Sequence, residues 1–90
     1  MTSAWITRSF PRHDGRYGAR IVPRGKRGPA GVHQGRVLVG VVFEDKDVAV
    51  SAEHAMNGAI DELYETSWQI AFEAVEGVCL GVARTLIASN

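Results

Sequence analysis

The stretch RSFPRHDGRYGARIVPRGKRG, residues 8–28, places an arginine at every fourth position, at Arg8, Arg12, Arg16, Arg20 and Arg24. A spacing of four aligns side chains on one face of a helix, and also on one face of a strand because four is even. All three prolines of the chain and six of its ten glycines lie in residues 1–35, which excludes a helix of useful length there. We therefore expect extended pieces at residues 5–10 and 17–22, with a turn at Asp14-Gly15 that could close a hairpin.

The next stretch, GRVLVGVVF at residues 35–43, is apolar and rich in β-branched residues, which is typical of a central strand. Residues 44–47, EDKD, supply a polar turn, and Val48–Val50 would return as a short strand. The sequence therefore predicts an antiparallel hairpin at residues 36–50. Gly40 inside the first of these strands indicates a bulge or a side chain that crosses closely above it.

Residues 51–90 are expected to be helical, with one or two helices over about residues 52–88. Ser51 is the expected N-cap, and Asn57-Gly58 is a potential break after which Asp61 could cap a second helix. One long kinked helix and two helices in succession both fit the pattern. Polar side chains recur at the three-and-four spacing of one exposed face. These are Glu62, Glu65, Gln69, Glu73, Glu76 and Arg84.

Together these segments predict an α+β fold with a small antiparallel sheet of three or four strands, packed against the C-terminal helices. The chain would be a single domain over residues 1–90, with a basic extended region at 1–35, the hairpin at 36–50 and the helical region at 51–90. A chain of 90 residues buries only about 60–65% of its unfolded surface, so its core would be thin. We expect a homodimer, because the apolar arc of the helical region is wider than a small sheet can cover.

Two glycines on this helical region, Gly77 and Gly81, form a small-xxx-small pair. Each glycine costs about 1 kcal/mol of helix propensity relative to alanine, so a close approach of another backbone would have to offset the loss. That backbone could belong to the protein's own sheet or to a second copy. The expected helix-packing residues are Trp68, Phe72, Val75, Gly77, Val78, Gly81 and Val82.

The net charge of zero conceals a strong asymmetry between the two halves of the chain. Residues 1–40 hold eight basic side chains against Asp14 alone, whereas residues 41–90 hold two basic side chains against nine acidic ones. The halves therefore carry net charges of +7 and −7. Either the two halves neutralise each other in the fold, or the basic half binds an acidic surface of another molecule.

No motif in the chain predicts catalysis, a metal or a cofactor. His13, His33, His54 and Cys79 have none of the close pairings that zinc sites use. Cys79 lies on the apolar side of the helical region, where a thiol is normally inert, and the glutamates form a solvated stripe. The loop at residues 25–31, GKRGPAG, lacks the ending of a nucleotide-binding P-loop. We therefore expect a protein that is not an enzyme and binds no cofactor.

A cytoplasmic location is expected as well. Cys79 is the only cysteine, which suits a reducing compartment. The N-terminal residues lack the apolar core of a signal peptide, and the most apolar window, residues 68–88, holds too many polar groups to span a membrane.

The arginines suggest what the basic half does. Arginine outnumbers lysine seven to one in residues 1–40, and its planar fork binds carboxylates and phosphates bidentately. Trp5, Phe10 and Tyr17 are interleaved with the arginines, as in surfaces that anchor in a protein pocket or stack on bases. The expected partner-binding residues are Trp5, Arg8, Arg12, Arg16, Tyr17, Arg20, Arg24, Lys26 and Arg27.

Two functions fit this surface. The first is a small protein-binding module, an adaptor or inhibitor of the kind common in phages and mobile elements, that docks on an acidic site of a larger protein or nucleoprotein complex. The second is a nucleic-acid-binding accessory protein, which ranks lower because the acidic half would repel a polyanion. The competing interpretation is that the arginines pair with the protein's own carboxylates or only aid solubility.

Overall fold

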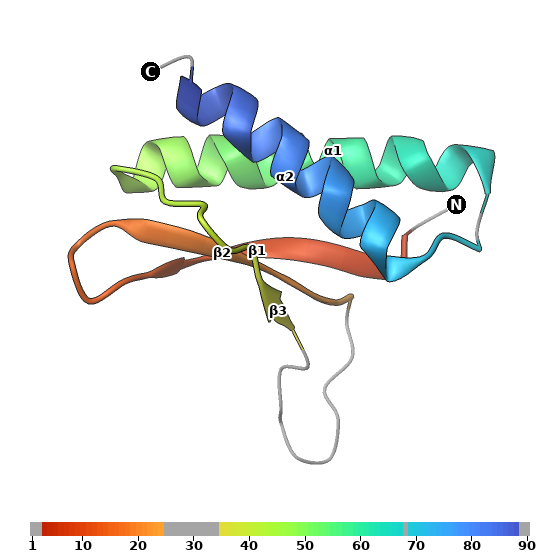
Figure 1. Cartoon of the computed structure of the whole chain (residues 1–90), viewed down its shortest axis with the longest axis horizontal. Helices are drawn as coiled ribbons and strands as arrows, with labels where there is room; N and C mark the ends of the chain where they lie inside the picture. Colours follow the sequence, from red (N-terminus) through yellow and green to blue (C-terminus); the bar gives the residue numbers. More distant parts are fainter. Residues whose placement is uncertain (1–2, 25–34, 68, 89–90) are drawn as a thin grey trace.

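The computed structural model describes residues 3–24, 35–67 and 69–88. Its elements follow in the order β1 (Trp5–Pro11), β2 (Tyr17–Pro23), β3 (Arg36–Val37), α1 (Lys46–Thr66) and α2 (Phe72–Ala88). The three strands form one antiparallel sheet in the order β1-β2-β3, and both helices lie over the same face of it (Figure 1). The expected α+β fold, a small antiparallel sheet under C-terminal helices, is confirmed.

The hairpin of β1 and β2 lies where the turn residues of the sequence place it. Arg12 and Arg16 close the turn through a hydrogen bond of 2.8 Å from the Arg12 N–H to the Arg16 carbonyl. Gly15 has a φ of +84°, in the left-handed region that favours glycine. The register pairs Arg8 with Arg20 and Phe10 with Gly18 across the two strands. Cross-strand partners share a face of the sheet, so this register decides which side chains lie together.

The predicted hairpin at residues 36–50 is wrong. Only Arg36 and Val37 form a strand, and the chain turns at Gly40, where φ is +80°, before Phe43 pairs with Tyr17 in an isolated bridge. Val48–Val50, the expected return strand, lies in the first turns of α1. The segment at residues 38–43 is apolar because it crosses the end of the sheet and contributes Leu38, Val41 and Phe43 to the buried core.

The helical region forms two helices and ends at Ala88, as expected, but the predicted N-cap and the predicted break are both wrong. Asp45, not Ser51, is the N-cap of α1, and its carboxylate accepts a hydrogen bond of 2.9 Å from the Val48 N–H. Asn57-Gly58 and Asp61 lie within the continuous α1, whereas the chain leaves the helix at Ser67, whose φ and ψ are −163° and 138°. Tertiary contacts of the α1 side chains outweigh the low helix propensity of Asn57 and Gly58.

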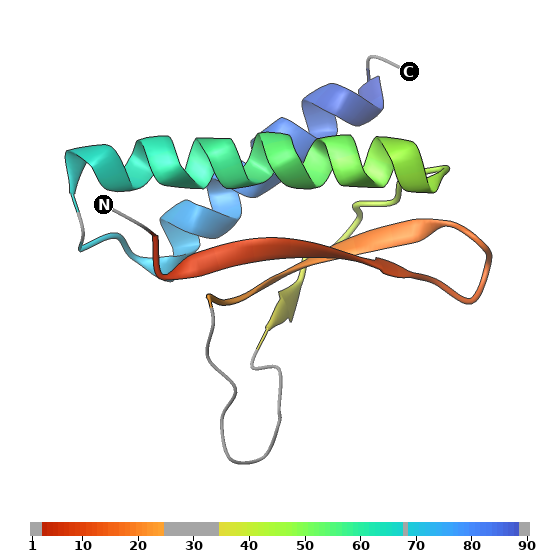
Figure 2. The same ribbon diagram turned by 180° about the vertical axis from the view of Figure 1, so that it is seen from behind.

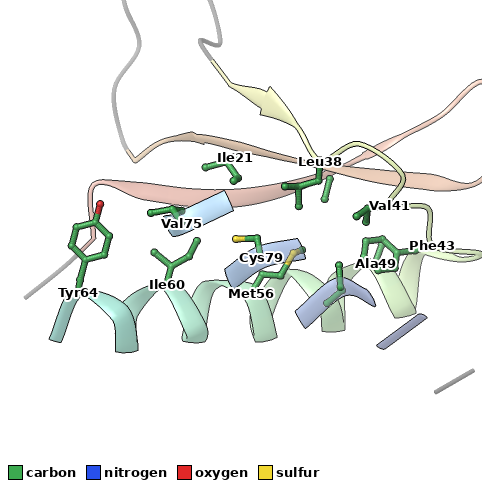
Figure 3. Packing of buried hydrophobic residues seen from close by; sticks show 13 residues of the cluster. Ile21, Leu38, Val41, Phe43, Ala49, Met56, Ile60, Tyr64, Val75 and Cys79 are labelled. Atoms are coloured by element: carbon green, nitrogen blue, oxygen red, sulfur yellow. The ribbon is translucent and has the colours of Figure 1, made fainter. Parts of the chain in front are cut away.

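The core lies between the helices and the covered face of the sheet. Met56 and Ile60 of α1 and Val75 of α2 have no exposed surface, and they lie opposite Ile21 of β2 and the crossing segment that carries Phe43 (Figure 3). Within the sheet, Thr7 of β1 and Ala19 and Ile21 of β2 point toward the helices. Since strand side chains alternate, the even-numbered residues of both strands lie on the opposite face.

Polar side chains of α1 form hydrogen bonds with N–H groups on the outer edge of β1. The Glu53 carboxylate accepts hydrogen bonds from the Ser9 N–H at 2.8 Å and from its hydroxyl at 2.9 Å. The side-chain oxygen of Asn57, Oδ1, accepts hydrogen bonds from the Thr7 N–H at 2.7 Å and from the Thr7 hydroxyl at 2.8 Å. Four helical residues rise by about 6 Å and two strand residues by about 6.7 Å, so side chains four apart on α1 meet N–H groups two apart on β1. We call this arrangement the polar edge.

The expected close packing of Gly77 and Gly81 on the protein's own sheet is wrong. Both glycines are exposed, and a Cβ atom built on either would have no atom of the described residues within 4 Å beyond its own helix. A contact across a dimer remains a prediction. Within the described chain, nothing offsets the helix propensity that these glycines lose.

Replacing Gly77 by alanine should therefore raise the free energy of unfolding by about 0.5–1 kcal/mol, because alanine restricts the unfolded chain and fits open space. Urea unfolding followed by circular dichroism measures the change. Gly18→Ala is the contrasting variant, since its Cβ would lie 2.6 Å from the Phe10 ring. A Gly77→Ala protein less stable than the parent would show that another backbone does pack on this glycine.

Candidate binding site

Two of the five regularly spaced arginines are held by the hairpin turn itself. Asp14 accepts from the Arg12 guanidinium at 3.2 Å and from the Arg16 guanidinium at 2.9 Å, and it also accepts from the Arg16 N–H at 3.0 Å. These hydrogen bonds, that of Arg12 first, hold the pKa of the Asp14 carboxyl well below its usual value. Arg16 also lies 3.6 Å from Glu44. Both guanidinium groups therefore already have carboxylate partners.

Two further arginines meet carboxylates that the fold brings from far along the chain. Arg24 donates to the Ser3 carbonyl at 2.9 Å and lies 3.7 Å from the Asp61 carboxylate. Arg36 pairs with Glu76 at 3.4 Å, and its guanidinium lies 4.7 Å from the centre of the Phe72 ring. These arginines tie the strands to the helices, which is the internal pairing considered for the basic half.

Arg8 and Arg20 differ from the rest of the series. They are direct cross-strand partners in β1 and β2, on the face of the sheet that points away from the helices. No carboxylate of the described residues lies within ion-pairing distance of either one. Two like charges placed directly opposite each other destabilise a strand pair. This pair therefore carries an unfavourable interaction that the described chain leaves uncompensated.

Phe10 lies beside this arginine pair and orients one of its members. The guanidinium of Arg20 lies 4.6 Å from the centre of the Phe10 ring, a cation–π contact. The far end of the ring lies over Gly18, the cross-strand partner of Phe10, where a Cβ would come within 2.6 Å of it. The glycine thus makes room for the ring, and the ring supports the guanidinium from one side.

A hollow of about 590 Å³ lies at this end of the sheet. We call it the basic hollow. Phe10, Pro11, Arg12, His13, Asp14 and Arg20 line it. Arg12 pairs with Asp14, whereas Arg20 pairs with no carboxylate of the described residues. The hollow can therefore hold an anionic group against Arg20 and the Phe10 ring.

An apolar row continues the same face beyond the arginines. The register pairs Ile6 with Val22, one row along from Arg8 and Arg20, and it pairs Arg20 with Val37. Val37 is 45% exposed although it is apolar. Neither helix lies over this side of the sheet (Figure 2). We name the surface formed by Ile6, Arg8, Phe10, Arg20, Val22 and Val37 the open face.

The structure places the two expected aromatic anchors elsewhere. Trp5 and Tyr17 are partly buried against the core on the helix side, and the Trp5 ring meets the Phe72 ring edge-on with centroids 4.9 Å apart. They are therefore packing residues in this fold. Phe10 lies among the cations instead, and its position two residues from Arg8 in one strand is the signal that could have assigned it to the site.

The remaining predicted site residues fall into two groups. Lys26, Arg27 and Trp68 lie outside the described residues. Of the expected helix-packing residues, Val75 is fully buried within the molecule, and Phe72, Val78 and Val82 pack against its core. Cys79 is also buried, and desolvation together with the nearby Glu76 raises the pKa of its thiol to about 12. A thiol of that kind is a packing group, not a nucleophile.

Within the described ranges, no cluster of three or more histidine, cysteine, aspartate or glutamate side chains is arranged to hold a metal ion. In the same ranges, none of the helices combines the length and the apolar character that a membrane span needs.

Comparisons with models of protein families, with curated proteins and with solved structures find no match to this chain. The residues and geometry of the open face are therefore the basis for a functional proposal.

Proposed function

We propose that the chain is a protein-binding module without enzymatic activity, an adaptor or inhibitor that docks its open face on an acidic site of a larger protein or nucleoprotein complex. The observation that carries this proposal is the cross-strand pair of Arg8 and Arg20, which no described carboxylate neutralises, beside an aromatic ring. The pairing of Arg12, Arg16, Arg24 and Arg36 within the molecule narrows the proposed surface to the open face.

Electrostatics supports this choice of partner. Repulsion between two guanidinium groups on adjacent strands is relieved when carboxylates of a partner lie between or above them. Arg20 is also partly oriented by Phe10 before a partner arrives, which lowers the entropy that binding has to remove. Arginine and aromatic side chains next to each other are typical of the residues that contribute most to protein–protein binding.

The distribution of acidic residues favours a polypeptide over a nucleic acid. Glu62 and Glu65 of α1 and Glu73 of α2 are exposed on the helical layer, whereas β1, β2 and β3 contain no acidic residue. A polyanion longer than the open face would meet repulsion at the margins. A protein partner can present a local acidic site that ends where the open face ends.

A nucleic-acid partner is the second candidate, and the Phe10 ring between arginines is the observation that favours it, because such rings stack on bases. The dependence of affinity on salt separates the two. Neutralising several phosphates gives a slope of about −0.9 per phosphate against the logarithm of the salt concentration. Little retention on heparin at moderate salt would argue against this candidate.

The test is recovery of tagged protein from its native host, with co-purifying polypeptide and nucleic acid both measured. We expect the double variant Arg8→Glu/Arg20→Glu to recover at least 10-fold less co-purifying polypeptide than the parent, because it turns two attractive contacts into repulsive ones. Arg84→Glu is the matched control, since it makes the same type of charge change on the exposed surface of α2 and should bind as the parent does. Unchanged binding by the double variant, with its fold intact by circular dichroism, would contradict the proposal.

A cytoplasmic location and a homodimer belong to the same proposal. The single cysteine supports the first, and the exposed apolar side chains of Val50 on α1 and Ile87 on α2 support the second. Light scattering at micromolar concentration tests the dimer, and a monomer would contradict it.

A further inference from the structure

We infer that the open face recognises an acidic protein segment that sets an apolar side chain about 7 Å from one or two carboxylates. This inference rests on the proposed function and specifies the chemistry of the partner. It draws on the arrangement of the open face in rows, in which an apolar row, a cationic row and an aromatic position follow one another along the strands.

The register defines the rows. Ile6 and Val22 form the apolar row, Arg8 and Arg20 form the cationic row with Val37 at its end, and Phe10 lies over Gly18 in the third position. Successive rows lie two residues apart along a strand, which corresponds to about 6.6–6.8 Å. The face therefore presents two kinds of surface at a set separation.

A partner has to match this separation. In an extended segment, residues two apart lie about 6.7 Å from each other on one side, and in a helix, residues four apart lie about 6 Å from each other. A leucine or valine that lies two residues from a glutamate in an extended segment, or four residues from it in a helix, would place its side chain on Ile6 and Val22. The carboxylate would then reach the forks of Arg8 and Arg20.

The apolar row is the reason to prefer such a segment over a purely acidic one. Docking of an aliphatic side chain would remove apolar surface of Ile6, Val22 and Val37 from water, which favours binding. A run of carboxylates alone would leave this row in contact with water. A nucleic-acid strand likewise has no aliphatic side chain to place there.

Binding of synthetic peptides to the whole protein tests the inference, with fluorescence anisotropy as the measurement. The first probe is a peptide in which one leucine and two glutamates alternate with serine. The second has the same composition but places leucine three residues from the nearest glutamate, on the opposite side of an extended segment. The third contains glutamate and serine alone. A single-stranded oligonucleotide of equal charge is the fourth. We expect the first peptide to bind at least 10-fold more tightly than the second and third.

Variants of the two rows distinguish the inference from the function on which it rests. Ile6→Thr and Val22→Thr keep the β-branched shape that strands favour, and they should lower the affinity for the first peptide about 10-fold without affecting the third. The double variant Arg8→Gln/Arg20→Gln should lower the affinity for all three peptides. Thermal unfolding of each variant verifies that the sheet is intact.

Each outcome decides one point. Equal affinity for the three peptides, or no effect of the threonine variants, would contradict a role of the apolar row in recognition. The proposal of an acidic partner would still stand. Peptide binding that survives loss of both arginines would overturn the open face as the docking surface and the proposed function with it. Failure of every acidic peptide to bind would overturn this inference, and tighter binding of the oligonucleotide would favour the nucleic-acid candidate.

Discussion

Replacing Phe43 by alanine should lower the free energy of unfolding by about 3–5 kcal/mol. Phe43 is 1% exposed, and its side chain is part of the buried core (Figure 3). Removal of a buried aromatic ring forfeits its transfer free energy and leaves a cavity that the surroundings fill only partly. Small domains are stable by only about 5–15 kcal/mol, so this variant should be close to unfolding at physiological temperature.

The position of Phe43 in the fold makes the effect larger than side-chain volume alone implies. Its N–H donates to the Tyr17 carbonyl at 2.8 Å, and its carbonyl accepts from the Tyr17 N–H at 2.9 Å. This bridge attaches the crossing segment, and with it the start of α1, to the end of the hairpin. Loss of the Phe43 side chain therefore also weakens the attachment of the helical layer to the sheet.

Urea unfolding monitored by circular dichroism measures this prediction. Val39→Ala is the matched control, because Val39 lies in the same crossing segment and is 84% exposed. The control should change the free energy of unfolding by less than about 0.5 kcal/mol. A Phe43→Ala protein that unfolds at the urea concentration of its control would contradict the position of this ring in the core.

The second large effect should come from the polar edge, where Asn57→Leu is expected to lower the free energy of unfolding by about 2–3 kcal/mol. Leucine has the same branching and number of side-chain heavy atoms as asparagine and a higher helix propensity, but it cannot accept a hydrogen bond. The N–H of Thr7, whose side chain is fully buried, would then lose its acceptor at 2.7 Å. The Thr7 hydroxyl would keep only the Glu53 carbonyl, at 3.4 Å.

Asn57→Asp is the matched control for this prediction, because a carboxylate oxygen can accept both hydrogen bonds from Thr7. We expect it to lose clearly less stability than Asn57→Leu in the same urea titration. Hydrogen exchange of the Thr7 N–H gives a local measurement, and its protection should fall in the leucine variant. Equal stability of the leucine variant and the parent would show that the polar edge contributes nothing.

The polar edge also occupies N–H groups of β1 through which another strand could extend the sheet. Unpaired N–H groups at the edge of a sheet attract further strands, and proteins commonly cover them. Glu53 and Asn57 satisfy two such groups at Ser9 and Thr7. Extension of the sheet at this edge is therefore disfavoured, which agrees with the proposed binding through the open face.

The strands of the hairpin could be predicted to within about one residue, and the reason is local. The turn at Gly15 and the prolines at the strand ends set the limits through the conformations of single residues. The start of α1 could not be predicted in this way, because Val48–Val50 has the composition of a strand. Packing of Ala49 in the core and the cap of Asp45 outweigh that local preference.

The sequence alone could not select which arginines form the candidate site. The sequence singled out the arginine series and the neighbouring aromatics, yet the structure leaves Arg8 and Arg20 alone in that series without a described carboxylate. Equal spacing made all five arginines look alike. Which of them is neutralised depends on Asp14 within the turn and on Asp61 from the middle of α1.

The order of residues along the chain thus determined the class of fold, the hairpin and the separation of charge into two halves, because turn and strand preferences act between near neighbours. Tertiary structure alone decided which arginines have no carboxylate partner among the described residues and that Phe10 lies beside them. The pair of Arg36 and Glu76, for example, joins residues 40 positions apart. Exposed charges interact strongly only within about 8 Å at physiological salt, so their partners are set by the folded arrangement in space and not by spacing in the sequence.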